Sequence, residues 1–555
     1  MKRRLLSAFL AVMMVLTMAP VAFAADTETT TEYVAQVDGT NYETLADAIE
    51  AANNKTLTLL KDVNGQIVIP EGKTVTLDLN GNTVTAPSGR YDAVINQGTL
   101  TVTDSQKTGE IISNGNGGIG ISAGSDTTIE YAKVTGREGA IGGDKSTVGA
   151  KLTINDGVFT GVDNAVVIFN GSKRDGDANK ITINGGIFNG KIQSPGYIAC
   201  GIYAPWKDDI TVNNGTFNIE NGAGIVARGG MVTVKGGEFN TTGNITGMVG
   251  DYKGTVPCSA LVFDSTAGYP GMNDDSQIVV EDGKFKSDVA AVTVIKQTSD
   301  AGNRVKVTGG TFSSDVSAYV AEGYVQNNGT VEQLGETNAV AEVGGTYYKT
   351  LAEAVSAADN NTVTLLKNTV EDVVIPADKT ITLDLNGKKI VNSTTAQDSK
   401  VANDARKHTI TNNGTLTIMD SVGGGVVDNV SHGRAALYNN GTITEIKGGK
   451  FTRSVDNSTD SESANGNSWY VVYNAEGATI SKISNGEFLA LGHFSSLFSN
   501  CGTIDEISGG TFTQDHFIAF KNEGTVNKIS GGVFSSADES CIQNWGTIGE
   551  ICGGT

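Results

Sequence analysis

The residues best suited to acid/base chemistry are two pairs of adjacent aspartates and four histidines. The pairs are Asp208-Asp209 and Asp274-Asp275, and the histidines are residues 408, 432, 493 and 516. A carboxylate pair can supply the general acid and the general base of a hydrolysis. The aspartate pairs and the histidines fall in opposite halves of the chain, and the histidines lack the spacing of a metal site. We therefore assign no catalytic residue, no metal ligand and no cofactor, and expect solvated loop aspartates.

A possible calcium loop begins at Asp175, followed by Asp177 and Asn179 at the third and fifth positions. Its sixth position is Lys180, where such a loop needs glycine, and its twelfth is Gly186, where it needs a bidentate glutamate. The segment therefore favours a turn over a metal site.

The residues best suited to binding a ligand are aromatic and lie in three segments, 190–209, 246–276 and 452–470. We take as candidate ligand-binding residues Tyr203, Trp206, Tyr252, Trp469 and Tyr470. Aromatic faces beside polar groups suit sugar rings, through apolar stacking and hydrogen bonding. The alternative is that these rings pack onto the body of the protein and hold the segments in place.

Composition limits the elements that can position these segments. The 555 residues include 71 glycines but only 8 prolines, and 39% are hydrophobic. Collagen would need glycine at every third position and abundant proline. A disordered chain would be less hydrophobic, and a helical bundle would not tolerate so much glycine. The composition predicts many short strands and tight turns, in a chain long enough for two or more domains.

The first 24 residues predict export. Lys2, Arg3 and Arg4 precede an apolar stretch, and Ala22-Phe23-Ala24 is a small-x-small cleavage site. The formal net charge of −21 becomes −24 when these three cations are removed with the signal peptide. An exported acidic chain is a poor partner for nucleic acid, and no later stretch is apolar enough to span a membrane. We therefore expect an extracellular or cell-surface protein, whose five scattered cysteines are buried thiols instead of a disulfide framework.

The chain contains an internal duplication. Residues 35–81 and 341–387 align without a gap and share 28 identities in 47 positions. Each copy begins with apolar residues at helical spacing after a hydroxyl-x-x-acid capping pattern, which predicts short amphipathic helices over 44–53 and 350–359. We expect a signal peptide at 1–24, a linker at 25–34, a first domain at 35–333 and a second at 334–555.

A shorter repeat runs through both copies. The motif Gly-x-Phe closes a strand-like segment at Phe159, Phe188, Phe217, Phe239, Phe285, Phe312, Phe451, Phe488, Phe512 and Phe534. Near the end of the chain the step is 22 residues, and Asn500, Asn522 and Asn544 recur at one position of it. Apolar pairs are spaced by two in early repeats but by three in late ones, as in Ile504 and Ile507.

A repeat of about 22 residues with short strands is typical of one turn of a parallel β-helix. Equivalent residues of successive turns lie about 4.8 Å apart, so one core position becomes a column of like side chains. A column of asparagines can form a ladder of amide hydrogen bonds. We predict an all-β fold of tandem right-handed parallel β-helices, each opened by a short amphipathic capping helix that covers the exposed edge of the first turn.

The capping helix, the run Ile-Pro-x-x-Lys-Thr-x-Thr-Leu-Asp-Leu-Asn-Gly and the Gly-Gly-x-Phe turns resemble right-handed β-helix surface proteins of Gram-positive bacteria, which share the pectate-lyase-like fold. The resemblance covers nearly all of the mature chain and implies a fold more than an activity. The pectin-hydrolase family carries Asn-Thr-Asp, Asp-Asp, Gly-His-Gly and Arg-Ile-Lys in that order. Here His432-Gly433-Arg434 is similar to the histidine motif, but Asn-Thr-Asp and Arg-Ile-Lys are absent.

The sequence therefore favours a non-catalytic surface protein that presents loops for adhesion or for contact with a polysaccharide or a host or cell-wall glycan. A polysaccharide lyase or glycoside hydrolase is one alternative, and a spacer that holds another domain is a second. The chain ends at Thr555, one residue before the position where the next phenylalanine of the repeat would fall. We therefore expect a second domain cut off before its end, with further domains downstream.

Overall fold

The computed structural model describes residues 32–555 except 145, 170–175, 193, 251–253, 270, 394–405, 432, 454–468 and 491–495. The predicted signal peptide lies outside the described residues. The described chain consists mainly of short strands joined by turns, with two seven-residue α-helices. None of its helices is long and apolar enough to cross a membrane.

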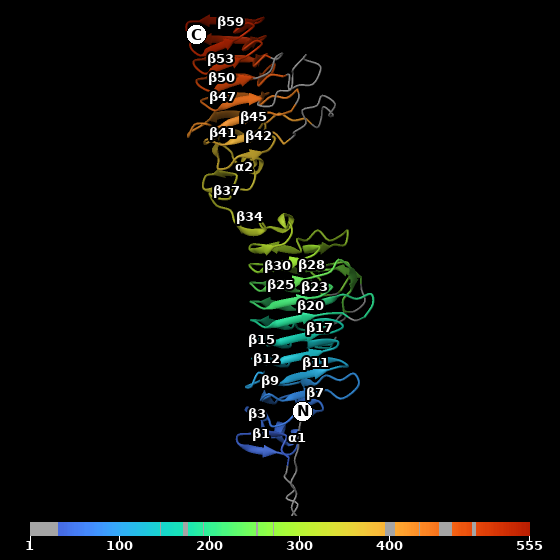
Figure 1. Cartoon of the computed structure of the whole chain (residues 1–555). Helices are drawn as coiled ribbons and strands as arrows, with labels where there is room; N and C mark the ends of the chain where they lie inside the picture. The colour runs from blue at the N-terminus through green and yellow to red at the C-terminus, as the bar shows by residue number, and fades with distance from the viewer. Residues whose placement is uncertain are drawn as a thin grey trace, which may run out of the picture.

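Six long sheets form two stacks of three sheets each (Figure 1). The first stack runs from β1 (Ala35–Val37) to β35 (Thr330–Gln333), and the second from β36 (Ala341–Val343) to β59 (Thr547–Ile551). Through most of each stack a strand pairs in parallel with the third strand after it, so the chain visits the three sheets in turn. One such circuit is called a coil below. The predicted fold class, an all-β parallel β-helix, is confirmed.

In the first stack, the first sheet extends from β2 (Thr40–Tyr42) to β32 (Val305–Val307), and the second from β4 (Val63–Asn64) to β34 (Tyr324–Asn327). The third sheet carries the features of interest. Its strands are β5 (Ile67–Ile69), β8 (Val94–Asn96), β11 (Gly117–Ile121), β14 (Gly139–Gly143), β17 (Ala165–Phe169), β20 (Ala199–Ala204), β23 (Gly222–Ala227), β28 (Ser259–Asp264) and β31 (Ala290–Ile295).

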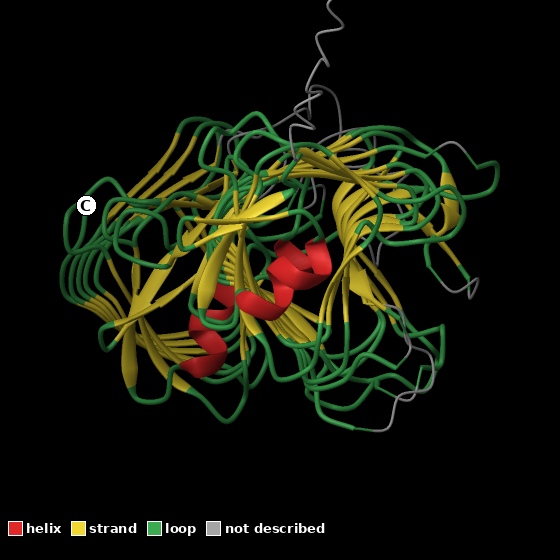
Figure 2. Ribbon diagram, turned by 90° about the horizontal axis from the view of Figure 1, so that it is seen from below, coloured by secondary structure: helices red, strands yellow, loops and turns green. Residues whose placement is uncertain are grey.

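In the second stack, the first sheet extends from β37 (Thr346–Tyr348) to β59, and the second from β39 (Thr369–Val370) to β57 (Val533–Ser536). The strands of its third sheet are β40 (Val373–Ile375), β43 (Ile410–Asn412), β46 (Leu437–Asn439), β49 (Val472–Asn474), β52 (Phe498–Asn500), β55 (Phe520–Asn522) and β58 (Ile542–Asn544). Seen along the stacks, the strands of successive coils superpose into bundles (Figure 2).

The predicted helices are present at the start of each stack. They are α1 (Leu45–Ala51) and α2 (Leu351–Ala357), and each bears the predicted capping threonine. Thr44 Oγ1 accepts a hydrogen bond from the Asp47 amide at 3.2 Å, and Thr350 Oγ1 accepts one from the Glu353 amide at 3.1 Å. The apolar side of each helix belongs to the core of its own stack, so each helix covers the first coil.

Antiparallel strands cover the edges that the helices leave. Strand β1 pairs antiparallel with both β2 and β3 (Lys55–Leu59) at the beginning of the first stack, and β35 pairs antiparallel with β33 (Gly310–Phe312) and β34 at its end. Open strand edges favour pairing with other chains. The change of direction therefore protects both ends of the first stack.

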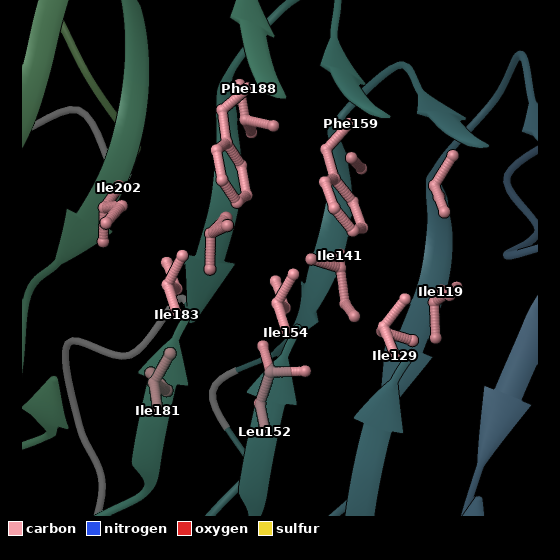
Figure 3. Close-up of a cluster of buried hydrophobic side chains, with 14 of the residues drawn as sticks. Ile119, Ile129, Ile141, Leu152, Ile154, Phe159, Ile181, Ile183, Phe188 and Ile202 are labelled. Carbon is pink, nitrogen blue, oxygen red and sulfur yellow. The ribbon is translucent and has the colours of Figure 1, made fainter. Parts of the chain in front are cut away.

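Columns of like side chains fill the interior, as the repeat predicts. Leu152 and Ile154 lie one coil from Ile181 and Ile183 (Figure 3). The six Gly-x-Phe rings of the first stack pile up with neighbouring centroids 4.4–5.1 Å apart. The four rings of the second stack pile up at 4.6–5.2 Å. Each stack thus has its own continuous core.

The predicted asparagine ladder is also present, and it is longer than the sequence indicated. The side-chain amides of Asn412, Asn439, Asn474, Asn500 and Asn522 each donate to the side-chain carbonyl oxygen of the next asparagine at 2.7–2.8 Å, and Asn544 accepts the last of these hydrogen bonds. Buried amides need such partners, because an unpaired polar group costs free energy in a low-dielectric interior.

A register shift explains the change in apolar spacing between early and late coils. Between β44 (Thr415–Met419) and β47 (Thr442–Ile446), Leu416 pairs with Ile443 but Ile418 pairs with Ile446. The additional residue forms a bulge, which keeps both isoleucines in the core although they are three residues apart. Later coils keep this arrangement.

The cysteines are all free, but only part of the prediction of buried thiols is confirmed. Cys200 and Cys258 are buried. Cys501 is partly exposed, and Cys541 and Cys552 are exposed. The prediction is wrong for the last two, which flank β58 and β59, the terminal strands of their sheets.

Candidate functional site

The five predicted binding residues are found in different environments. Tyr203 and Trp206 are buried, with 1% and 2% of their surface exposed. Tyr252 lies outside the described residues. Trp469 and Tyr470 are partly exposed and lie in one aromatic cluster. Only this last pair offers ring surface to a ligand among the predicted residues that the structure describes.

Tyr203 is buried because the outer face of the third sheet is covered in this part of the first stack. The hairpin of β26 (Thr246–Met248) and β27 (Thr255–Pro257) contributes Val249 and Val256 to an outer apolar cluster that includes Tyr203. The hairpin therefore has its own small core, which is separate from the interior of the stack.

A buried polar network holds the same region together. Arg228 donates to Asp264 at 2.9 Å and to the Tyr203 hydroxyl at 3.2 Å. The Tyr203 and Tyr269 hydroxyl oxygens lie 3.3 Å apart, and burial raises the pKa of Tyr203. For Tyr203 these contacts match the alternative that the aromatic residues fix the inserted segments onto the stack.

The second stack carries an aromatic cluster on the outer face of its third sheet. We call His408, Tyr438, Trp469, Tyr470 and Tyr473 the aromatic strip. The Tyr438 and Tyr473 rings stack with centroids 5.5 Å apart, and Trp469 stacks on Tyr473 at 5.2 Å. Tyr470 lies 5.5 Å from Tyr473, and His408 stacks on Tyr438 at 4.5 Å. All five side chains are partly exposed.

Strand alternation places the two tyrosines on the outer face. In β46 and β49 the flanking residues point into the core, so the middle residue points out. Tyr438 and Tyr473 are register partners across this pair of strands. Each comes directly before a member of the asparagine ladder, and this position was the sequence signal that could have identified them. His408 had no such signal. It precedes β43 in the sequence and meets the Tyr438 ring only in the folded protein.

The imidazole of His408 is neutral at neutral pH. Burial, together with the positive charges of Arg434 and Arg453, lowers the pKa of His408 to about 4. Its Nδ1 accepts a hydrogen bond from the Ala435 amide at 2.9 Å. A neutral imidazole whose Nδ1 accepts carries its proton on Nε2. The ring can therefore stack on Tyr438 and donate a hydrogen bond from its other nitrogen.

The hydroxyl of Tyr473 is also held in its neutral form. The Tyr473 hydroxyl oxygen lies 3.4 Å from Cys501 Sγ, and this contact and burial raise the pKa of Tyr473. The strip thus combines apolar ring faces with neutral polar groups. Such a surface suits a polyhydroxylated ring better than a charged or purely apolar ligand.

The acid/base candidates do not form one site in the described residues. Asp208 is buried and accepts from the Asn179 amide at 3.0 Å, so the expectation of a solvated residue was wrong for it. Asp274 and Asp275 are exposed. Of the histidines, 432 and 493 lie outside the described residues, and His516 contacts Asp538 at 2.9 Å.

Among the residues that the structure describes, no group of three or more His, Cys, Asp and Glu side chains could hold a metal ion. The first aspartate of the possible calcium loop lies outside the described residues. Asn179 is buried and uses its side chain within the fold, where it accepts from the Ala150 amide at 3.0 Å and donates to the Thr147 carbonyl at 3.1 Å.

The chain matches no protein-family model, no curated protein and no solved structure.

Proposed function

We propose that this chain is an exported, non-catalytic surface protein that binds a polysaccharide or a host or cell-wall glycan through the aromatic strip. The observation that carries the proposal is the in-register pair Tyr438 and Tyr473, with Trp469 stacked beside them. Partly exposed rings in one row offer apolar faces to sugar rings, while the hydroxyl and imidazole groups at their edges can form hydrogen bonds.

The scaffold supports this function. The residue before each of Tyr438 and Tyr473 is buried in the core, and the residue after each belongs to the asparagine ladder. A site on regular strands keeps its geometry more accurately than one on loops. Binding therefore requires little ordering of the protein, which limits the entropic cost of association.

The resemblance to pectate-lyase-like surface proteins of Gram-positive bacteria is part of the proposal, and it supports a location outside the cell. A lyase or hydrolase has less support. Of the two acid pairs noted in the sequence, Asp208 is buried and bonded within the fold, while Asp209, Asp274 and Asp275 are exposed. A spacer without a ligand would not need partly exposed aromatic rings in register.

The test is binding of the purified chain to a panel of plant, host and cell-wall polysaccharides, with and without Ca²⁺. We expect at least one polysaccharide to bind, and we expect Trp469→Ala to weaken it at least tenfold. The matched control is Trp545→Ala, because Trp545 is exposed but packs against Lys521 instead of the strip. Release of reducing ends or unsaturated products above background would contradict the non-catalytic proposal, and equal losses in both variants would contradict the assignment of the strip.

A further inference from the structure

A second surface feature, independent of the aromatic strip, lies on the outer face of the third sheet of the first stack. It is a groove of about 380 Å³ over β8, β11 and β14, within the range of small-ligand sites. Asp92, Glu138 and Asp144 line it, and Ile95 and Ile168 lie along the same outer column. We call it the acidic groove.

The groove exists because glycines leave the sheet bare. Along one outer column the register partners are Ile95, Gly120, Gly142 and Ile168. The two glycine coils between the isoleucines form a floor of backbone, about 10 Å wide at the ordinary spacing of strands. The next residue of this column after Ile168 is Tyr203, and the hairpin of β26 and β27 covers the Tyr203 side chain.

The glycines also allow one carboxylate to lie directly on the floor. Asp92 Oδ1 accepts from the Gly117 amide at 2.8 Å and from the Asn116 side chain at 2.9 Å. Its Oδ2 occupies the space that a Cβ at Gly120 would take. Any side chain at Gly120 would displace the carboxylate, so the glycine and the aspartate form one arrangement.

The position of the Asp92 carboxylate disfavours its charged form. Burial raises the pKa of Asp92, and the nearby charge of Asp144 adds to the effect. The described lining residues include three acids, and Lys145, between the lining residues Asp144 and Ser146, lies outside the described residues. The carboxylate oxygen Oε1 of Glu138 lies 3.5 Å from Nη2 of Arg90, and the Arg90 side chain is largely exposed. A partly desolvated carboxylate is a favourable partner for a cationic group that enters from solvent.

We propose that the acidic groove binds an amino sugar, with the protonated amine held by Asp92 and Asp144 across the glycine floor. The flat floor accepts a ring, and Ile95 and Ile168 border it with apolar surface. The side chains of Asn116, Ser122 and Ser146, which also line the groove, suit hydroxyl groups. The amine distinguishes this ligand from the neutral sugars that suit the aromatic strip.

The test uses the full chain and glucosamine oligomers, compared with the same oligomers in N-acetylated form, at 0.15 M salt to screen unspecific attraction to an acidic protein. We expect the free-amine oligomer to bind at least tenfold more tightly than the acetylated one. Asp92→Asn should abolish this difference, and Gly120→Ala should weaken binding by displacing the carboxylate. The control Asp274→Asn removes an exposed acid elsewhere in the same stack and should change binding less than twofold.

Three results would overturn the proposal. They are equal binding of the two oligomers, equal losses in Asp92→Asn and Asp274→Asn, or tighter binding of oligolysine than of the amino sugar. Thermal unfolding of each variant identifies loss of fold, and the Gly120→Ala variant keeps the test open if Asp92→Asn fails to fold. None of these results depends on the aromatic strip, so Trp469→Ala should leave binding of the amino sugar unchanged.

Discussion

Tyr438 and Tyr473 lie on successive strands of one sheet, and their rings stack with centroids 5.5 Å apart and planes inclined by 10°. They are 35 residues apart in the sequence, but the parallel register makes them direct neighbours. The register itself is enforced by the core residues and asparagines on either side of each tyrosine. The aromatic strip is therefore a consequence of how the coils stack.

The first prediction concerns the face of Tyr438. Tyr438→Ala should weaken binding of the polysaccharide by about tenfold, since an aromatic contact contributes about 1–1.5 kcal/mol. Tyr438→Phe keeps the ring and should retain most of the affinity. Titration calorimetry or surface plasmon resonance measures both variants. If the phenylalanine variant loses as much as the alanine variant, the hydroxyl and not the ring face carries the interaction.

The second prediction concerns the asparagine ladder. Asn439→Ala should lower the free energy of unfolding by about 2–4 kcal/mol, because neighbouring buried amide groups lose hydrogen-bond partners. Asn439 donates to Asn474 at 2.7 Å and accepts from Asn412 at 2.8 Å. Chemical denaturation measures the change. The adjacent Asn440 is exposed, and Asn440→Ala should change stability by less than about 0.5 kcal/mol. If both variants lose a similar free energy of unfolding, the buried hydrogen bonds of the ladder do not stabilise the protein.

The third prediction concerns the phenylalanine column. Phe217 is fully buried, with ring centroids 4.4 Å from Phe188 and 4.5 Å from Phe239. Phe217→Ala should cost about 3–5 kcal/mol, since it removes buried surface and leaves a cavity. Ile187→Ala is the control on the neighbouring coil, where the side chain is 43% exposed. Denaturation curves that coincide for the two variants would contradict the packing of this column.

The fourth prediction concerns pH and His408. Because the folded-state pKa of about 4 lies below the ordinary value of 6.5, the neutral form is favoured in the folded protein. The stability that this shift contributes, about 3 kcal/mol, is fully present above pH 6.5 and is lost as the pH falls toward 4. His408→Gln should remove this part of the acid sensitivity.

The measurement is urea denaturation of the wild type and His408→Gln at pH 7 and pH 4. The control is His516→Gln, which alters a histidine on a different coil beside Asp538 and should keep the wild-type loss. If His408→Gln loses as much stability on acidification as the wild type, the titration of His408 does not govern the acid response.

The fold could be predicted because its information is local and repeated. The Gly-x-Phe motif and the recurring asparagines each mark one position of a coil, and coils pair only with their neighbours. The helices α1 and α2 followed from the same duplicated pattern. The prediction failed where it depended on which side chains other parts of the chain cover, as for the exposed Cys541 and Cys552.

The candidate sites were only partly predictable, for a physical reason. Trp469 and Tyr470 were identified by residue type, but Tyr438, Tyr473 and His408 join them only through the parallel register and the path of a segment that interrupts the repeat. Tyr203 has the same residue type, yet it is buried because a hairpin packs over its column. The acidic groove depends on Gly120, and in the sequence that glycine looked like any other residue of a turn. Periodicity alone thus determined which coils are neighbours. Only the packing of side chains and inserted segments on the outer faces decided which surfaces are covered and which are open to a ligand.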